Sequence, residues 1–282
     1  MLTTSGLLRL VSTFSAVWVI CPQTKPVAPG VDISYVLQNQ PHSLHEPVVL
    51  TFKVSNGLPN AIVLDLGQNR ENGFAFRLLR PDGTTVDSPS FTRNGISAIG
   101  TIVLRSGESL SQELLLNDRF QFNIPGKYQV VGHLAQEITD EKGNTLGSDP
   151  GFQKDLEIVP KDESSLRKVC QDLSDRLERS NSYDDAALIA RELAIIDDPV
   201  AVPFLDKALR ADRLIEPFIT SALVRIGNEE AVQALIGALN GKTGAAAEAV
   251  RRGLTQIRSR ISDPSLRELI DRALHEYQSQ GS

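Results

Sequence analysis

Two short segments hold residue types that can bind metal ions. The first, His42-Ser-Leu-His45-Glu46, combines two imidazoles and a carboxylate. On a strand, His42 and His45 would point to opposite faces, and the following Pro47 disfavours a helix, so neither geometry converges on one ion. The second, Asp140-Glu-Lys-Gly-Asn144, gathers oxygen atoms but lacks the alternating carboxylates and final glutamate of a calcium loop. We expect a solvated loop before a strand at the first segment, a hairpin tip at the second, and no metal site.

The common signatures of catalysis are absent from the sequence. There is no Gly-x-Ser-x-Gly, no His-Glu-x-x-His and no glycine-rich phosphate loop. The chain has only four histidines, and one of them, His275, lies near the C-terminus. We therefore predict a protein without enzymatic activity, with no catalytic residues and no cofactor.

A dense group of basic residues lies near the C-terminus, beside an alanine-rich helical surface at Ala245–Ala249. Its members are Arg251, Arg252, Arg258 and Arg260. Such a cationic edge is a candidate binding surface for an acidic protein partner. The alternative is a solvated helix face whose charge is balanced by Glu248 and Asp263.

The helical part of the chain repeats itself with a period of 30 residues. The first copy of the repeated positions comprises Leu193, Ile196, Ala201, Val202, Leu205, Ala208 and Leu209. The second copy comprises Leu223, Ile226, Ala231, Val232, Leu235, Ala238 and Leu239. This spacing predicts stacked helix pairs that bury their apolar faces against the neighbouring copy.

The phrase that joins the two helices of each pair resembles the short bacterial kind of HEAT repeat. Ile226-Gly-Asn-Glu-Glu-Ala-Val-Gln-Ala-Leu235 carries the full pattern, and the segment 196–205 departs from it only in having Asp197 where glycine is usual. The resemblance covers residues 184 to 275 and implies a short α-solenoid. It says little of function, because such repeats serve scaffolds, adaptors, inhibitors and a few lyases.

The first half alternates apolar and polar residues in short segments separated by turns, which predicts strands. The expected strands lie at 48–54, 61–64, 74–79, 84–86, 101–104, 109–116, 128–134 and 154–159. About eight short strands at this spacing are typical of an immunoglobulin-like β-sandwich. The phrase from Phe122 to Val131, with Pro125-Gly126-Lys-Tyr128, resembles the penultimate strand of extracellular sandwiches related to the BsuPI-type proteinase inhibitors. That resemblance implies a corner role for Tyr128, with its ring packed and its hydroxyl bonded to a backbone group.

The pattern changes at Pro160, where the alternation stops and Asp162 to Ser165 supply helix caps. We expect helices at 165–179, 184–196, 198–209, 215–226 and 229–239, then a third pair with a longer turn at 258–261 and a last helix after Pro264. Cys170 falls on the apolar face of the first of these helices and is expected to be buried. The predicted domains are a sandwich at 31–160 and a helical repeat domain at 161–282.

The first thirty residues resemble an export signal. Arg9 precedes an uncharged stretch from Leu10 to Ile20, which is too short to cross a bilayer. Cleavage at Ala28-Pro29-Gly30 would release a chain that starts near Val31. Cys21 stands where a lipoprotein would carry its lipid, although Ile20 is not the small residue that a lipobox requires, so membrane contact would need this segment or Cys21 as an anchor.

The formal net charge of −6 opposes binding to nucleic acid, which needs a basic face. We therefore predict an exported, non-catalytic module that binds or scaffolds proteins through its helical surface, in the periplasm, at the cell envelope or secreted. One alternative is a proteinase inhibitor that acts through the sandwich. Another is a lyase of the kind found among HEAT-like proteins, which would need a ligand-sized pocket with converging polar groups.

Overall fold

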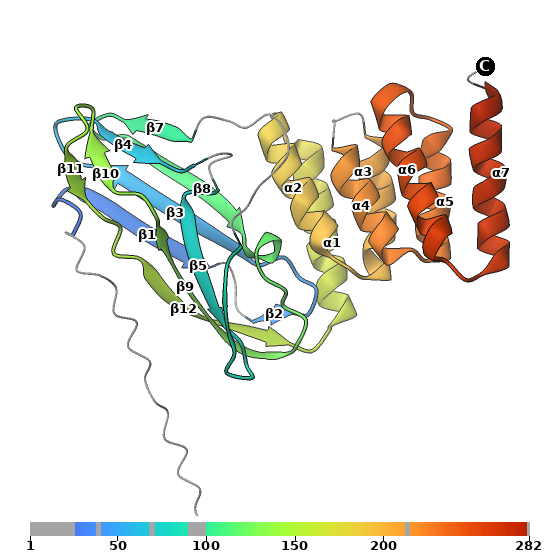
Figure 1. Ribbon diagram of the computed structural model, residues 1–282, viewed down its shortest axis with the longest axis horizontal. Coiled ribbons are helices and arrows are strands. Elements are labelled where there is room, and N and C mark those ends of the chain that lie inside the picture. Colours follow the sequence, from blue (N-terminus) through green and yellow to red (C-terminus); the bar gives the residue numbers. More distant parts are fainter. Residues whose placement is uncertain (1–25, 38–40, 68–70, 90–99, 212–214, 281–282) are drawn as a thin grey trace, which may run out of the picture.

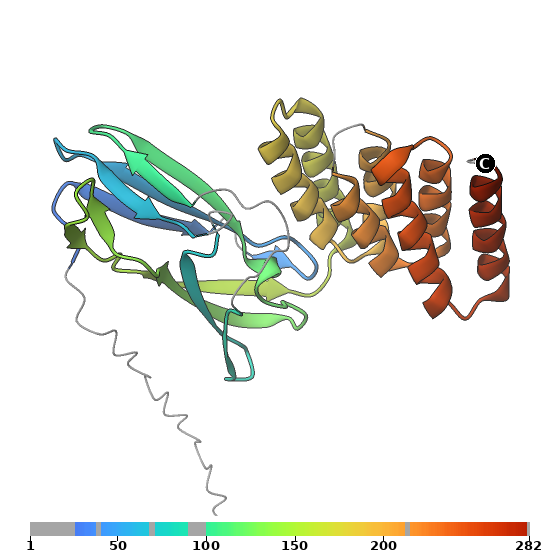
Figure 2. The same ribbon diagram turned by 45° about the horizontal axis from the view of Figure 1, so that its top comes forward.

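A computed structural model describes residues 26–37, 41–67, 71–89, 100–211 and 215–280 (Figure 1). The expected export signal and Cys21 therefore lie largely outside the described residues. The described chain forms an N-terminal region of β-sheets followed by a C-terminal region of helices. The helices form a row that extends away from the sheets, and the last helix lies at its far end in both views (Figures 1 and 2).

The strands of the N-terminal region form three sheets. The three-stranded sheet contains, in spatial order, β1 (Val31–Leu37), β3 (Val49–Asn56) and β8 (Ser109–Leu115). The four-stranded sheet contains β11 (Thr145–Gly147), β10 (Ile138–Asp140), β4 (Ile62–Asp65) and β7 (Thr101–Leu104). The five-stranded sheet contains β2 (His42–Ser43), β12 (Phe152–Val159), β9 (Gly126–Leu134), β5 (Phe74–Leu79) and β6 (Thr85–Asp87).

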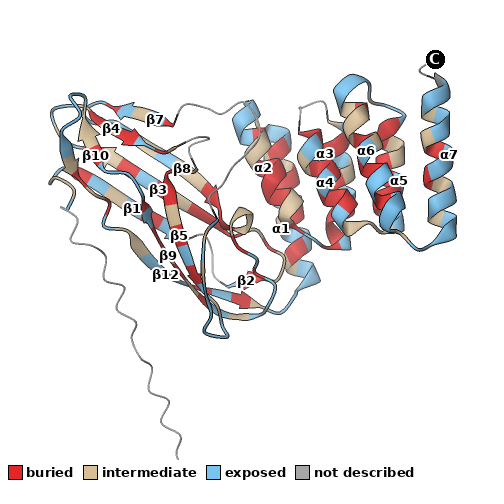
Figure 3. Ribbon diagram, viewed as in Figure 1, coloured by how far each residue is buried: buried red, intermediate tan, exposed pale blue. Residues whose placement is uncertain are grey.

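The three sheets share one apolar core, to which every sheet contributes buried side chains (Figure 3). Aromatic rings link the sheets: Tyr35 of β1 lies 4.4 Å from Phe152 of β12 between ring centroids, and Phe52 of β3 lies 5.0 Å from Phe74 of β5. Gly132 of β9 leaves the space that the rings occupy, because a Cβ there would lie 2.3 Å from Phe76. Close packing of the aromatic rings against one another and against the backbone at Gly132 therefore holds the sheets together.

Tyr128 has the corner role that the sequence predicts. Its hydroxyl donates a hydrogen bond of 2.7 Å to the carbonyl of Ile124, and its ring packs against Phe122 with 5.4 Å between centroids. The segment 140–144 is confirmed as a hairpin tip, between β10 and β11. Its turn is held by Asp140, whose carboxylate accepts hydrogen bonds from the backbone N–H groups of Lys142 and Asn144.

The segment His42–Glu46, which was predicted to be a solvated loop, differs from its prediction. His42 belongs to the two-residue strand β2, which pairs with the end of β12, and it is only 5% exposed. A solvated loop is therefore wrong for His42. Its strand partner, Ile158 of β12, lies more than a hundred residues further along the chain, so no local pattern could show this burial.

Seven α-helices follow the sheets in the described residues. They are α1 (Glu163–Arg179), α2 (Tyr183–Ile195), α3 (Val202–Arg210), α4 (Glu216–Ile226), α5 (Glu229–Leu239), α6 (Gly244–Arg260) and α7 (Pro264–Gln280). Helices α2, α4 and α6 contact one another in order, as do α3, α5 and α7, and α1 packs against α2 and α3. The helices therefore form two layers around one apolar core.

Most helix boundaries follow from local chemistry. The carboxylate of Asp162 accepts a hydrogen bond from the N–H of Ser164 at the start of α1, and Asn228 caps α5 in the same way through Ala231. Gly227 ends α4 with a φ of 61°, a conformation that glycine adopts without strain. The expected turn at 258–261 is wrong, because residues 254–263 contain no glycine or proline and the helix continues to Arg260.

Candidate functional site

The most concentrated chemistry in the described residues lies where the sheets meet the helices. Seven charged side chains that are buried or half-buried gather there, and we call them the junction cluster. The sheet region contributes Glu71, Glu113, Asp118 and Arg119, and the helices contribute Arg176, Arg191 and Glu192. Glu71 precedes β5, whereas Asp118 and Arg119 follow β8, so loops at one end of the sheets present these groups to α1 and α2.

Arg191 of α2 is the main contact between the two regions. Its side chain is 9% exposed and forms ion pairs with Glu71, at 2.8 Å between Nη1 and Oε1, and with Asp118. Burial lowers the pKa of the Arg191 guanidinium, but the two carboxylates outweigh that effect and the pKa is raised above its ordinary value. Arg191 is therefore held as a cation between two acids of the sheet region.

Arg119 completes the sheet side of the cluster. It donates a hydrogen bond to the backbone carbonyl of Glu71, and its guanidinium carbon lies 5.0 Å from the centroid of the Phe76 ring. Burial lowers the pKa of Arg119. Arg119 therefore supports the loop that presents Glu71 to Arg191.

Glu192, the chain neighbour of Arg191, is 2% exposed. Its Oε2 lies 3.1 Å from Nη1 of Arg176, and its Oε1 has no hydrogen-bond partner among the described residues. Burial raises the pKa of this carboxyl to about 7, Arg176 opposes the rise, and the charge of Glu113 adds to it. Burial of Glu192 therefore favours the uncharged form of its carboxyl.

A second group of contacts joins β2 and the following loop to the start of α1. The N–H of Asp162 donates to the hydroxyl of Ser43 at 2.9 Å, and the hydroxyl of Ser165 donates to Oε1 of Glu46 at 2.7 Å. Glu46 also lies 3.8 Å from Nδ1 of His42, measured from its Oε2. The histidine-containing segment thus serves the junction, and the described residues contain no cluster of three or more His, Cys, Asp or Glu that could hold a metal ion.

No expected site in the sequence corresponds to the junction cluster, although the repeat contains a signal for it. Positions 191 and 192 are Arg and Glu, whereas the next copy has Ser221 and Ala222 and the third has Arg252 and Gly253. Ala222 and Gly253 are buried, as Glu192 is, but they are small and uncharged. A buried glutamate in a place where the other copies have small residues indicates a local contact that those copies do not make.

The predicted partner-binding arginines all lie on α6 or at its end, and two of them make short ion pairs with acids. Nη2 of Arg251 lies 2.7 Å from Oε1 of Glu248, and Arg258 forms a double contact with Asp271 of α7. Arg252 lies 4.0 Å from Glu248 and is 71% exposed. Of the four, Arg252 and Arg260 thus remain the most available to a partner.

The other acid expected to balance these arginines, Asp263, has a different role. Its carboxylate accepts a hydrogen bond of 2.8 Å from the N–H of Ser265 and caps α7. Arg260 donates instead to the backbone carbonyl of Gln256, at 3.4 Å. The balance of charge therefore comes from Glu248 and from Asp271, which the sequence analysis did not consider.

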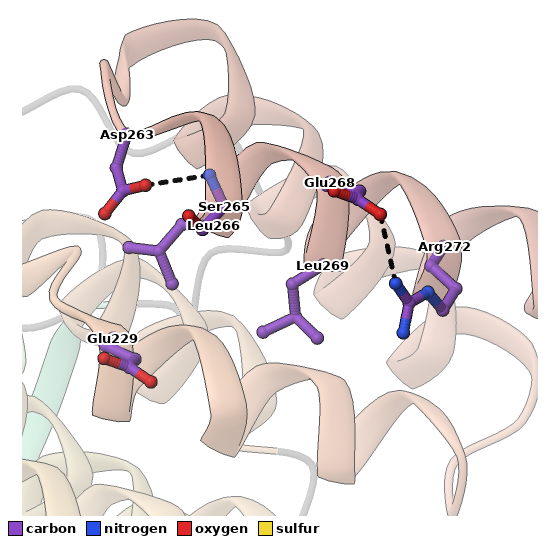
Figure 4. A pocket seen from close by; sticks show the side chains of 7 residues that line it. All are labelled: Glu229, Asp263, Ser265, Leu266, Glu268, Leu269 and Arg272. Carbon is purple, nitrogen blue, oxygen red and sulfur yellow. Dashed lines mark hydrogen bonds and ion pairs between the residues drawn. The ribbon is translucent and has the colours of Figure 1, made fainter.

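An open hollow of about 430 Å³ lies between α5 and α7 (Figure 4). Leu266 and Leu269 of α7 line it beside Glu229 of α5, and Glu268 is paired with Arg272 at 3.2 Å. These polar groups bond to neighbours on their own helix and do not converge on a common point, so the hollow lacks the arrangement that a catalytic pocket needs. In the described part of the chain, no helix combines the length and the apolar character required to cross a membrane.

Comparisons with known proteins identify no relative by sequence: neither a family model nor a curated protein matches. Solved structures resemble about half of the chain at low similarity. The sporulation control protein Spo0M of Bacillus subtilis is 13% identical, with a TM-score of 0.30 over 51% of this chain and 55% of its own. PapD-like domain 7 of human CEP192 is 15% identical, with a TM-score of 0.31 over 54% of this chain and 100% of its own.

Proposed function

We propose that this protein is an exported, non-catalytic module that binds or scaffolds other proteins. In this proposal the sheets form an immunoglobulin-like sandwich and the helices form a short HEAT-like solenoid. The observation that supports it best is the junction cluster, in which Arg191 is buried between Glu71 and Asp118. Such a contact holds the helical row at a fixed angle to the sheets, as a scaffold requires, and leaves the outer surfaces of both regions available.

The partner is an acidic protein that contacts α6 through Arg252, in the middle of the helix, and Arg260, its last residue. Arg252 and Arg260 are exposed there, and their guanidinium groups lack the short carboxylate contacts that Arg251 and Arg258 make. Arginine suits this role because its planar group binds carboxylates through two hydrogen bonds.

Affinity capture tests this function. The chain from residue 31 onward is immobilised and exposed to envelope proteins of its own cell, with a variant that combines Arg252→Glu and Arg260→Glu in parallel. We expect a specific acidic protein to be retained by the unchanged chain and lost by the variant, with stronger retention at low salt.

A matched control combines Arg167→Glu and Lys168→Glu, which reverse two exposed charges on α1. This control should retain the partner. Equal loss from both variants would show that the effect is one of net charge and would remove α6 as the contact, and no retained protein under any salt condition would remove the binding function.

A further inference from the structure

The repeat places Arg191, Ser221 and Arg252 in equivalent positions on three stacked helices. Ser221 lies 30 residues after Arg191, and Arg252 lies 31 residues after Ser221, the same offsets that relate the buried leucines of these helices. Helix α2 contacts α4, and α4 contacts α6. The three positions therefore lie in a line along one face of the helical row.

This face points away from the helical core. In all three helices the residue two positions later is a leucine buried in that core, and two residues are separated by about 200° around a helix. Ser221 and Arg252 are exposed, whereas Arg191 is buried against the sheet region, where it pairs with Glu71 and Asp118. The sheet region thus occupies the outward position of α2, and the same position is exposed on α4 and α6.

The junction shows what an arginine at this position can bind. Arg191 pairs with two carboxylates, Glu71 from before β5 and Asp118 from after β8. Both of its terminal nitrogens donate to Glu71, Nη1 at 2.8 Å and Nη2 at 3.4 Å. A planar guanidinium with five N–H donors can hold two carboxylates at once, whereas the lysine ammonium is a compact point charge. An arginine at the outward position is therefore suited to receive two acids from a neighbouring domain.

The surface around Arg252 leaves room for such a contact. The Arg252 side chain is 71% exposed, and its Nε lies 4.0 Å from Oε1 of Glu248, beyond hydrogen-bond distance. Ala249 lies one turn earlier on the same face, and the counterparts of Ala249 and Arg252 on α4 are the half-buried Phe218 and the exposed Ser221. We call Phe218, Ser221, Ala249 and Arg252 the α4–α6 face. It combines an available cation with small side chains and one partly exposed ring.

We propose that the α4–α6 face is a second docking surface of the same kind as the junction, on which Arg252 receives two carboxylates from the loops of an acidic partner domain. This inference rests on the proposed function and adds the chemistry of the partner's contact. Stacked helices lie about 8 to 10 Å apart, so the positions of Arg191 and Arg252 are separated by about 16 to 20 Å. The partner would lie beside the part of the sheet region that holds Arg191.

Titration of the full chain with two peptides, followed through the arginine Nε–H signals by nitrogen-15 NMR, tests the proposal. Both peptides are blocked at their ends; Glu-Gly-Asp has two carboxylates and Gln-Gly-Asp has one. We expect the Arg252 signal, assigned by its loss in Arg252→Lys, to report about tenfold tighter binding of the first peptide. The Arg260 signal, at the other exposed arginine, should show a difference below about twofold. Equal binding of the peptides at Arg252, no saturation there, or the same preference at Arg260 would overturn the proposal.

Conservative variants in the affinity capture separate this inference from the proposed function. Arg252→Lys keeps the positive charge but not the planar donors, so we expect it to lose the partner that Arg260→Lys retains. Retention by Arg252→Lys would overturn the paired-carboxylate contact and leave the proposed function in place, whereas the absence of any retained protein would overturn both. A dimer of the unchanged chain in sedimentation that Arg252→Lys dissolves would assign the face to a second copy and overturn the separate partner.

Discussion

At the scale of single residues, the buried polar groups depend most on the fold, because each is costly to bury without a hydrogen-bond or ion-pair partner. Arg191, Glu192 and the Tyr35–Asp149 pair all lie where water is excluded, so each needs a specific partner. Asp149 accepts hydrogen bonds from the hydroxyl of Tyr35 and the backbone N–H groups of Leu134 and Gly151. These residues are spread over the chain, and only the fold brings their partners together.

Replacement of Arg191 by methionine should destabilise the protein by about 3 kcal/mol, because it leaves Glu71 and Asp118 without their cation. Urea unfolding of the full chain measures this loss. Arg252→Met is the matched control, since Arg252 is 71% exposed, and its effect should stay within about 0.5 kcal/mol. Equal effects of the two changes would contradict a structural role for the buried pair.

Tyr128→Phe should cost about 1 kcal/mol, because the carbonyl of Ile124 loses its hydroxyl donor while the ring packing remains. The same unfolding assay measures it. Tyr183→Phe, at a side chain that is 56% exposed, provides the control and should have no measurable effect. A neutral result at Tyr128 would show that the corner hydrogen bond contributes nothing.

Cys170 is fully buried, and burial raises the pKa of its thiol to about 12. The thiolate is the form that attacks thiol reagents, so Cys170 should react only when α1 detaches from the helical core. Labelling of a Cys21→Ser variant in its folded state and in urea measures this. Fast labelling of the folded protein would contradict the close packing of α1.

At the scale of elements, the sequence predicts the helices better than the strands. The two copies of the repeat predict α4 and α5 to within a residue, because their apolar spacing and the Gly227-Asn228 turn are local signals. Strand β1 was not predicted, since its long pairing with β3 is what makes it a strand. β2 has only two residues, too few for any period to show.

Helices α4 and α6 approach closely at Gly253, where a Cβ would lie 2.7 Å from Cγ2 of Thr220 and 3.0 Å from Cγ2 of Val224. Gly253→Val should therefore destabilise the protein by about 1 to 3 kcal/mol through overpacking. Ala245→Val, at an exposed position of the same helix, tests for the effect of the β-branched side chain alone. Thermal unfolding distinguishes them, and an equal change in both variants would contradict close contact at Gly253.

The candidate site was predictable only in part, for a physical reason. The four arginines of the C-terminal part are close in sequence, so a basic segment was visible, but the pairing of Arg258 with Asp271 depends on how α7 packs. Arg191 meets its partners across 120 residues to Glu71 and 73 residues to Asp118. No local pattern contains such a contact, and only the unusual Arg-Glu pair within the repeat hints at it.

At the scale of the whole molecule, the contacts at the junction join the sheet region and the helical region into one unit. Ion pairs at α2 and hydrogen bonds from Ser43 and Glu46 to the start of α1 hold the helical row from two sides. Interfaces between domains of a chain are often small and permit movement, so a buried cation at this position is a specific restraint. The exposed faces of the sheets and of α6 then keep a constant separation while the junction is intact.

Small-angle scattering of the full chain beside Arg191→Ala tests this restraint most directly. If the junction holds the regions together, the unchanged protein at pH 5.5 scatters as a single arrangement with the helices against the sheets, and Arg191→Ala shows a larger maximum dimension with intact helical content. Two freely moving bodies in the unchanged protein, or an unaltered profile in Arg191→Ala, would contradict it.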